Sequence, residues 1–211
     1  AKKNPDREVV FFGIGFETTV PSTALTILQA KADGVSNFSV FCNHITIVPT
    51  IKAILDSPDL QLDGFLGPGH VSMVIGTTPY EFVSSYYKKP MVVAGFEPLD
   101  ILQSIWMVLK QIAEGRAETE NQYARIVPKH GNSPALSAVT EVYEIREFFE
   151  WRGLGSIDHS GLKIRDAFST FDAEAKFTMP NIKIADPKSC QCGEVLKGAI
   201  KPWQCKVFGG A

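Results

Sequence analysis

Residues 8–19 read EVVFFGIGFETT, an apolar and β-branched run that ends in a polar motif. A continuous apolar run of this length is typical of a strand buried in a parallel sheet. Leu25, Leu28 and Ala32 follow at helical spacing, so this stretch predicts one strand–helix unit. The fold follows from the repetition of this unit along the chain.

The strand–helix order recurs through the first half of the chain. Phe38–Cys42 and Ile47–Leu55 form the second unit, Leu62–Leu66 is the third strand, and Met91–Ala94 precedes a helix that reaches Ile112. Alternation with connections of this length predicts right-handed crossovers and parallel strands. We therefore predict an α/β fold, a parallel sheet with helices on both faces (Rossmann-like), followed by a small Cys-bearing segment.

The second half is less regular. Arg125–Val127 predicts a further strand after a polar linker, and Ser137–Trp151 predicts a long helix. The pattern weakens beyond Gly153, so we place one domain boundary there and another near Asp186. The predicted parts are an α/β domain at residues 1–153, an extension at 154–185 and a Cys-bearing segment at 186–211.

Composition sets mild bounds on function. With 211 residues, 45% hydrophobic content and a formal net charge of −2, the chain can bury a core as an ordinary soluble globular protein. Because there is no basic footprint and no apolar run long enough to span a bilayer, we expect neither nucleic acid nor membrane as a partner. No initiator Met or secretory leader is visible, and the four cysteines suit a reduced protein. We expect a cytoplasmic fragment.

A compact polar motif follows each of the four strand-like runs. The motifs are Gly15-Phe16-Glu17-Thr18-Thr19, Cys42-Asn43-His44, Gly67-Pro68-Gly69-His70 and Gly95-Phe96-Glu97-Pro98. Open parallel sheets bind ligands at the edge where strands hand over to helices. We therefore expect the four motifs to meet at one edge and to form a site.

Glu17 and Glu97 occupy equivalent places, each after Gly-Phe at the start of a helix. A carboxylate there stabilises the positive end of the helix dipole, so each Glu alone is explained equally well as a helix cap. Glycine permits close backbone approach, and the recurrence of the motif at two strand ends favours a site over two independent caps.

Imidazole and thiol groups follow the second and third strands. His70 lies in a glycine-bracketed turn, which leaves a functional and a structural role equally open. Cys42 and His44 share a face of an extended strand, where they would bind a metal or form a thiolate–imidazole pair, unless Cys42 is an inert buried thiol. Thr18 stands where the dinucleotide fingerprint has its third glycine, so no nucleotide pocket is indicated.

Three cysteines gather in the tail, at Cys190, Cys192 and Cys205. Thiolates are the usual ligands of iron–sulfur clusters and of structural zinc, and loops rich in glycine and proline can wrap such centres. The spacing does not separate zinc from iron–sulfur, three thiols complete neither site, and unrelated thiols are the remaining alternative.

These motifs together resemble the HypD family of hydrogenase maturation factors. The resemblance rests on the four strand-end motifs and on the tail from Cys192-Gly193-Glu194-Val195-Leu196 through Pro202 to Cys205, and it covers nearly the whole chain. In that family two similar α/β domains flank a cleft, and a smaller region binds a four-iron four-sulfur cluster. The resemblance implies that residues 1–153 are the second α/β domain, 154–185 pack on or link the α/β domains, and 186–211 begin the cluster region. It implies a fragment without the N-terminal domain and the end of the cluster region.

The implied function is a scaffold and redox role in assembling the iron–cyanide–carbonyl centre of nickel–iron hydrogenase. The partners would be the maturation proteins HypC and HypE, with HypE delivering cyanide, and the cargo is iron that carries cyanide and carbonyl. The resemblance leaves enzymatic activity open and implies a metallocentre maturation factor, for which a redox role is expected, rather than a conventional enzyme. The family's essential Cys-x-x-Cys motif lies in its first domain and does not occur in this sequence. We therefore expect this chain alone not to bind the iron intermediate fully.

The resemblance also assigns residues. The cleft-facing group, which would orient iron ligands or partner groups by hydrogen bonding, consists of Glu17, Thr18, Thr19 and His70. A second group expected to help bind the cofactor or cargo consists of Cys42, His44 and Glu97. The expected cluster ligands are Cys192, Cys205 and Cys190.

Two other functions stay open on the residues alone. The chain could be a small-molecule enzyme whose acid–base pair is Glu17 or Glu97 with His70, and whose tail binds structural zinc. It could instead be a docking module for partner proteins, in which the strand-end residues are only caps. The identity of any bound metal separates the enzyme from the scaffold.

Overall fold

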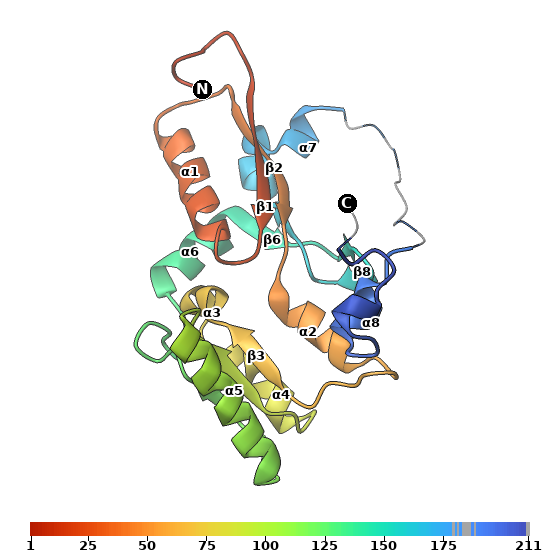
Figure 1. Cartoon of the computed structure of the whole chain (residues 1–211). Helices are drawn as coiled ribbons and strands as arrows, with labels where there is room; N and C mark the ends of the chain where they lie inside the picture. Colours follow the sequence, from red (N-terminus) through yellow and green to blue (C-terminus); the bar gives the residue numbers. More distant parts are fainter. Residues whose placement is uncertain (179, 181, 183–186, 188, 210–211) are drawn as a thin grey trace. The chain divides into compact units, whose positions relative to one another are not determined.

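The computed structural model describes residues 1–178, 180, 182, 187 and 189–209. Strands and helices alternate through its first half (Figure 1). In chain order the elements are β1 (Val9–Gly15), α1 (Val20–Ala32), β2 (Phe38–His44), α2 (Ile47–Leu55), β3 (Phe65–Pro68), α3 (Gly69–Ile75), η1 (Thr78–Tyr80), α4 (Glu81–Ser85), β4 (Met91–Ala94), α5 (Pro98–Ala113), β5 (Thr119–Asn121), α6 (Ser133–Val142), β6 (Tyr143–Ile145), β7 (Phe148–Trp151), β8 (Gly155–Asp158), β9 (Leu162–Ile164), η2 (Asp166–Phe171), α7 (Ala173–Lys176), α8 (Cys192–Leu196) and η3 (Pro202–Gln204).

The chain divides into two compact units, and neither is continuous in sequence. Unit 1 comprises Ala1–Ile47, Ser133–Phe149 and Asp158–Lys183. Unit 2 comprises Val48–Asn132, Glu150–Ile157 and Ile184–Ala211. The predicted domain bounds near residues 153 and 185 concern functional parts of the chain, and they stay predictions.

The parallel strands lie in two sheets. β1 pairs with β2, with Gly15 opposite His44, and β3, β4 and β5 form the second sheet, with Gly67 opposite Val93. The predicted α/β class with helix-flanked parallel strands is confirmed. The prediction that all four strands share one sheet edge is wrong, because β1 and β2 belong to unit 1 whereas β3 and β4 belong to unit 2. An apolar strand pattern does not specify which strand lies beside it, and it does not ensure burial either, since Phe11, Phe12 and Ile14 of β1 are exposed.

The core of unit 1 lies between α1, α6 and the inner face of β2. Ile27 of α1, Val40 of β2 and Val142 of α6 are completely buried there, with Phe168 and Phe171 of η2 beside them. Figure 1 shows α1 and α7 on either side of β1 and β2. The packing explains why these short elements are stable, since tertiary burial rather than helix propensity holds such helices.

In unit 2 the sheet is short and α5 runs against it. All four residues of β4 are buried, as expected for a central parallel strand. The fifth strand is Thr119–Asn121, so the prediction of a strand at Arg125–Val127 is wrong. Thr119–Asn121 is polar because it lies at the edge of the sheet. Such a short, half-buried strand shows no apolar pattern from which the sequence could predict it. No helix in the described part of the chain is long and apolar enough to cross a membrane.

The prediction of one long helix at Ser137–Trp151 is also wrong. α6 ends at Val142, and Tyr143–Ile145 pairs in antiparallel fashion with Leu162–Ile164. Tyr143 thereby becomes fully buried in the unit 1 core. A distant strand has overridden the local helical spacing, which a sequence pattern cannot anticipate.

Candidate functional site

The strand end of unit 1 is a tight turn between β1 and α1. Gly15 adopts a φ of +137°, and a Cβ there would stand 2.5 Å from Thr19 Oγ1. Thr19 closes the turn, because its backbone N–H donates to Phe16 O at 3.0 Å and its hydroxyl donates to the same oxygen at 3.2 Å. Thr18 and Thr19 are both exposed. The turn therefore presents the two hydroxyl-bearing residues to solvent.

Glu17 turns its carboxylate inward. Oε1 accepts the backbone N–H of Ile47, the first residue of α2, at 3.0 Å. Oε2 is buried and has no hydrogen-bond partner among the residues that the structure describes. Burial raises the pKa of Glu17, and the N–H groups of Glu17 itself and Ile47 oppose that rise only in part. Glu17 thus caps α2 rather than α1 and keeps one oxygen unpaired.

Cys42 and His44 lie on the buried face of β2, as the alternation predicted, but each has its own partner. The Cys42 thiol donates to Leu162 O at 3.3 Å, and burial raises its pKa to about 11. His44 Nε2 lies 3.2 Å from the Thr23 hydroxyl, and burial lowers the pKa of the imidazole. The Cys42 thiol and the His44 imidazole therefore have separate partners, and His44 Nδ1 is buried without a hydrogen-bond partner among the described residues.

The strand end of unit 2 brings His70 and the second Gly-Phe-Glu motif together. His70, at the start of α3, stacks on the Phe96 ring with centroids 4.4 Å apart. The two ring planes are tilted by 31°, and both rings are exposed beside the end of β4. Close packing here needs glycine, because a Cβ on Gly69 would lie 2.3 Å from Ala94 O.

Glu97 is the N-cap of α5 and reaches a cation that follows β5. Its Oε2 accepts a hydrogen bond from Arg125 Nη2 at 3.1 Å. Arg125 also donates two hydrogen bonds to Asp100, from Nη1 to Oδ1 at 2.9 Å and from Nη2 to Oδ2 at 2.5 Å. Hydrogen bonds from Arg125, together with those of Glu97 and Gln122, hold the pKa of Asp100 well below its usual range. Glu97 itself keeps 61% of its side chain exposed.

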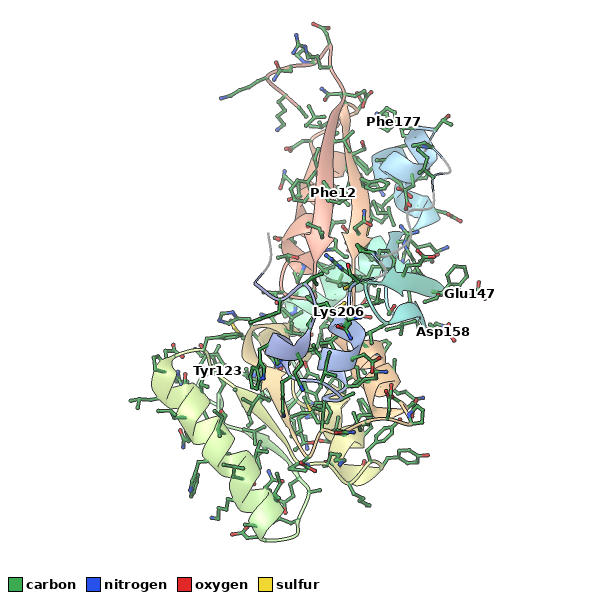
Figure 2. All side chains as sticks on the ribbon, turned by 45° about the vertical axis from the view of Figure 1, so that its right-hand side comes forward. Phe12, Tyr123, Glu147, Asp158, Phe177 and Lys206 are labelled. Carbon is green, nitrogen blue, oxygen red and sulfur yellow. The ribbon has the colours of Figure 1, made fainter. Side chains whose placement is uncertain are left out.

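Gln122 and Tyr123 complete this arrangement. Gln122 accepts the Gly95 N–H at 3.1 Å and donates to Asp100 Oδ1 at 2.7 Å, and the Tyr123 ring lies 4.5 Å from the Arg125 guanidinium. Figure 2 labels Tyr123 beside the unit 2 sheet. Sequence reasoning missed Asp100, Gln122, Tyr123 and Arg125. Their only signal is position, since Asp100 stands one helical turn after Glu97 and the other three follow the polar fifth strand.

The tail cysteines belong to unit 2. The Cys190 and Cys192 sulfurs lie 3.2 Å apart and share a hydrogen bond, and Cys192 also donates to Arg152 O at 3.5 Å. The Cys192 N–H and thiol lower the pKa of Cys190, whereas the same shared hydrogen bond raises the pKa of Cys192. Gly153 lets this loop approach, because a Cβ on it would lie 2.3 Å from the Cys192 sulfur.

These thiols fit part of a cluster ligand set. Sulfur donors suit an iron–sulfur cluster, and two of the three expected ligands converge. The segment of Cys205 comes near them, since the Lys206 N–H donates to Gln191 Oε1 at 3.1 Å, and Figure 2 labels Lys206. Within the described ranges, however, no group of three or more His, Cys, Asp or Glu residues is arranged to hold a metal ion. The chain therefore offers a partial rather than a complete ligand set.

The structure thus sorts the expected site residues into three places. Glu17, Thr18, Thr19, Cys42 and His44 belong to unit 1, and His70 and Glu97 to the strand end of unit 2. The third place is the cysteine loop.

The model of the HypD family, described as "Hydrogenase formation hypA family", matches residues 1–211. The chain belongs to the HypD family. It is 59% identical over 213 residues to "Hydrogenase maturation factor HypD" of Rhodobacter capsulatus, which covers 99% of this chain and 56% of that protein. It is 50% identical over 209 residues to "Hydrogenase maturation factor HypD" of Escherichia coli (strain K12), with the same coverage of 99% and 56%.

A third relative is named differently. The "Hydrogenase expression/formation protein HupD" of Azotobacter chroococcum mcd 1 is 51% identical over 214 residues, which cover 99% of this chain and 56% of that protein. The resemblance predicted from the motifs is therefore confirmed at the level of the HypD family. The chain spans a little over half the length of the relatives it matches, so the activity of a whole HypD protein is not thereby assigned to it.

Proposed function

We propose that the chain acts in hydrogenase maturation, as part of a scaffold with a redox role that assembles the iron–cyanide–carbonyl centre of nickel–iron hydrogenase. The proposed partners are the maturation proteins HypC and HypE, and the proposed location is the cytoplasm. Support comes from family membership over the whole chain and from the relatives' names. The iron that carries cyanide and carbonyl is cargo in this scheme.

The observation that carries the proposal is the unpaired carboxyl oxygen of Glu17. A buried polar atom without a partner is rare in proteins and calls for an explanation. Because burial raises the pKa of Glu17, the protonated form is favoured more than in water. A neutral carboxyl can donate a hydrogen bond, and cyanide nitrogen and carbonyl oxygen are acceptors. We assign Glu17 to orienting such a ligand, with Thr18 and Thr19 as exposed neighbouring donors.

His70 and Glu97 would provide the contribution of unit 2. The stack of His70 on Phe96 fixes the plane of the imidazole, and Arg125 fixes the carboxylate of Glu97. Second contacts of this kind hold a functional group in one orientation. We propose that these two side chains orient partner groups rather than act as an acid–base pair, since each is already held by a different neighbour.

The cysteine loop would supply the redox part. Cys192 and Cys205, with Cys190, are the proposed ligands of a four-iron four-sulfur cluster, which would store and release an electron when bound. Anaerobic iron and sulfide analysis tests this assignment. We expect Cys192→Ser and Cys205→Ser to lower both contents together, whereas zinc without sulfide would favour a structural zinc tail.

The maturation role is tested in cells that lack their own HypD. The chain replaces the matching segment of a relative, and hydrogenase activity is measured after expression. We expect Glu17→Ala and His70→Ala to abolish activity, and Glu17→Gln to retain part of it because an amide can still donate a hydrogen bond.

Matched controls change the same residue types elsewhere. Glu141 and His130 are exposed, so Glu141→Ala and His130→Ala should leave maturation unchanged. Circular dichroism and the amount of purified protein check that every variant folds. Full maturation by Glu17→Ala and His70→Ala would contradict the proposed function.

A further inference from the structure

The outer face of α5 is apolar and exposed. Six residues form it, with exposed fractions between 41% and 79%, and we call them the α5 stripe: Leu99, Leu102, Ile105, Trp106, Leu109 and Ile112. Leu99, Leu102, Trp106 and Leu109 follow steps of three, four and three residues, the spacing that lines one face of a helix. In Figure 2 side chains of α5 project away from the unit 2 sheet.

The inner face of the same helix is unusually polar. Asp100, Ser104 and Gln111 are buried on that side. The Ser104 hydroxyl donates to Asp100 O at 2.7 Å and Gln111 Oε1 accepts the Glu118 N–H at 2.7 Å, while Gln111 Nε2 is buried without a hydrogen-bond partner among the described residues. A surface helix normally buries its apolar stripe and exposes its polar face. In α5 the fully buried residues are polar, Ile101 and Val108 are half-buried, and most of the apolar stripe is left exposed.

An exposed apolar stripe of this length marks an interaction surface. Its regular helical spacing favours a second helix as the occupant, because two helices pack by fitting rows of side chains between one another. An irregular loop would not match a straight row about four turns long. The shape of the stripe thus selects the secondary structure of the partner.

The charges around the stripe select its chemistry. At the first end, Glu97 and Asp100 surround one cation, Arg125. At the other end, Lys110 and Arg116 face three carboxylates, which are Glu114, Glu118 and Glu120. Each group of charges has one more carboxylate than cations, but at the first end Asp100 is buried and only Glu97 is exposed. Lys110 Nζ lies 5.2 Å from the centroid of the Trp106 ring, so this cation packs against the α5 stripe.

We propose that the α5 stripe docks an amphipathic helix of a partner protein whose apolar face is flanked by Lys or Arg. The apolar rows would pack together, and the basic flanks would meet the exposed carboxylates, Glu97 at one end and Glu114 and Glu118 at the other. This inference rests on the proposed function, since a scaffold for metallocentre assembly has to hold partner proteins.

Two synthetic helical peptides of about 18 residues, or five turns, test the pairing. Both carry Leu at steps of three and four residues, and the flanking residues are Lys in one peptide and Glu in the other. Trp106 fluorescence reports binding, and Trp106→Phe shows how much of the signal is its own. We expect the Lys peptide to bind at least about tenfold more tightly, because several exposed ion pairs of modest strength add up.

A pair of variants locates the binding surface. Leu102→Glu places a charge in the middle of the stripe and should weaken the binding of the Lys peptide by about tenfold or more. Leu25→Glu is the matched control, because Leu25 is similarly exposed but lies on α1 in unit 1. It should leave peptide binding unchanged. Circular dichroism checks that both variants stay folded.

Several outcomes would overturn the docking proposal. Equal binding of the two peptides, or unchanged binding by Leu102→Glu, would remove the basic helix as the occupant. Sedimentation that shows dimers of the parent chain and monomers of Leu102→Glu would make a second copy the occupant. Binding of the parent chain to phosphatidylcholine vesicles, lost in Leu102→Glu, would point to lipid instead.

The cellular assay separates this inference from the proposed function. If Glu17→Ala abolishes maturation while Leu102→Glu retains it fully, the docking proposal fails and the maturation role stands. If neither variant affects maturation, the proposed function fails, and a peptide preference confirmed in solution would then describe a docking surface of another process.

Discussion

Unit 1 buries a carboxyl oxygen of its Gly-Phe-Glu motif, whereas unit 2 keeps the corresponding Glu97 side chain exposed. Glu17 and Glu97 follow the same two residues, Gly-Phe, at the end of a parallel strand. Glu17 directs one oxygen to the Ile47 N–H and leaves the other buried and unpaired, but Glu97 is exposed and binds Arg125. The same local sequence therefore serves two different electrostatic environments.

The thiols and imidazoles follow the same division. Cys42 and His44 are enclosed in unit 1, where burial raises the pKa of the thiol and lowers the pKa of the imidazole. His70 is exposed on a ring stack in unit 2, and Cys190 is only partly buried. The pKa of a side chain at a strand end therefore depends on what packs over that side chain, and not on its place in the motif alone.

The largest difference is expected in thiol reactivity. At pH 8 a thiol with a pKa of about 11 is almost entirely protonated, whereas the pKa of Cys190 is lowered. Cys190 should therefore react with iodoacetamide more than about a hundredfold faster than Cys42. Mass spectrometry of the alkylated peptides gives both rates. Rapid alkylation of Cys42 in the folded chain would show that burial does not suppress the reactivity of this thiol.

The next largest effect concerns the glycine of the first motif. Gly15→Ala forces a side chain into a φ of +137° beside the Thr19 hydroxyl, and we expect it to cost about 1–3 kcal/mol of unfolding free energy. Gly34→Ala is the control, because Gly34 has a φ of +65° but open space around it, and about 1 kcal/mol is expected. Urea unfolding measures both. Equal costs would show that the contact with Thr19 is unimportant.

Arg125→Ala tests the second motif. The pKa of Asp100 is depressed in the folded state, so Asp100 stabilises the fold above the pKa of the unfolded chain and this stability is lost as pH falls. Without Arg125 the pKa of Asp100 should rise toward its ordinary value, and the acid limb of stability against pH should flatten.

Urea unfolding between about pH 2 and pH 5 measures this limb for Arg125→Ala. The exposed pair of Lys129 and Glu81 provides a control, because Lys129→Ala removes an ion pair of 3.5 Å and should leave the limb unchanged. An acid limb as steep in Arg125→Ala as in the parent would show that Arg125 does not hold Asp100.

A smaller effect is expected for Glu17→Gln. The pKa of Glu17 is raised in the folded state, so its contribution to stability is present at low pH and is lost as pH rises through the folded-state value. The Gln variant should therefore be more stable than the parent at pH 7, by about 1 kcal/mol or less, and no more stable at low pH. Glu97→Gln, at an exposed position, should change little at either pH.

The sequence predicted the elements of the first half well. Ile47–Leu55 and Met91–Ala94 were expected with the bounds that α2 and β4 have, because each is a strongly apolar run between clear turn signals. The helix that reaches Ile112 was expected too, although the exposure of its apolar face was not. Periodicity reports which side of a helix is apolar, and it does not report whether another element covers that side.

The contacts that define the candidate site could not be predicted. Glu17 meets Ile47, which is 30 residues away, and Arg125 meets Asp100 across 25 residues. Both contacts depend on how strands and helices assemble, and the polar strand Thr119–Asn121 that leads to Arg125 has no apolar pattern. The strand-end positions of Glu17 and Glu97 were therefore predictable, whereas their partners and burial were not.

The most direct test of this account is the titration of the Glu17 side-chain carboxyl in the intact chain. Carbon-13 NMR follows its carboxyl signal against pH, and the spectrum of Glu17→Gln identifies that signal. The account predicts a pKa clearly above the ordinary value of 4.5, because the carboxyl is buried with one oxygen unpaired. A pKa at or below 4.5 would contradict it, because Glu17 would then be a solvated or ion-paired carboxylate like those of unit 2.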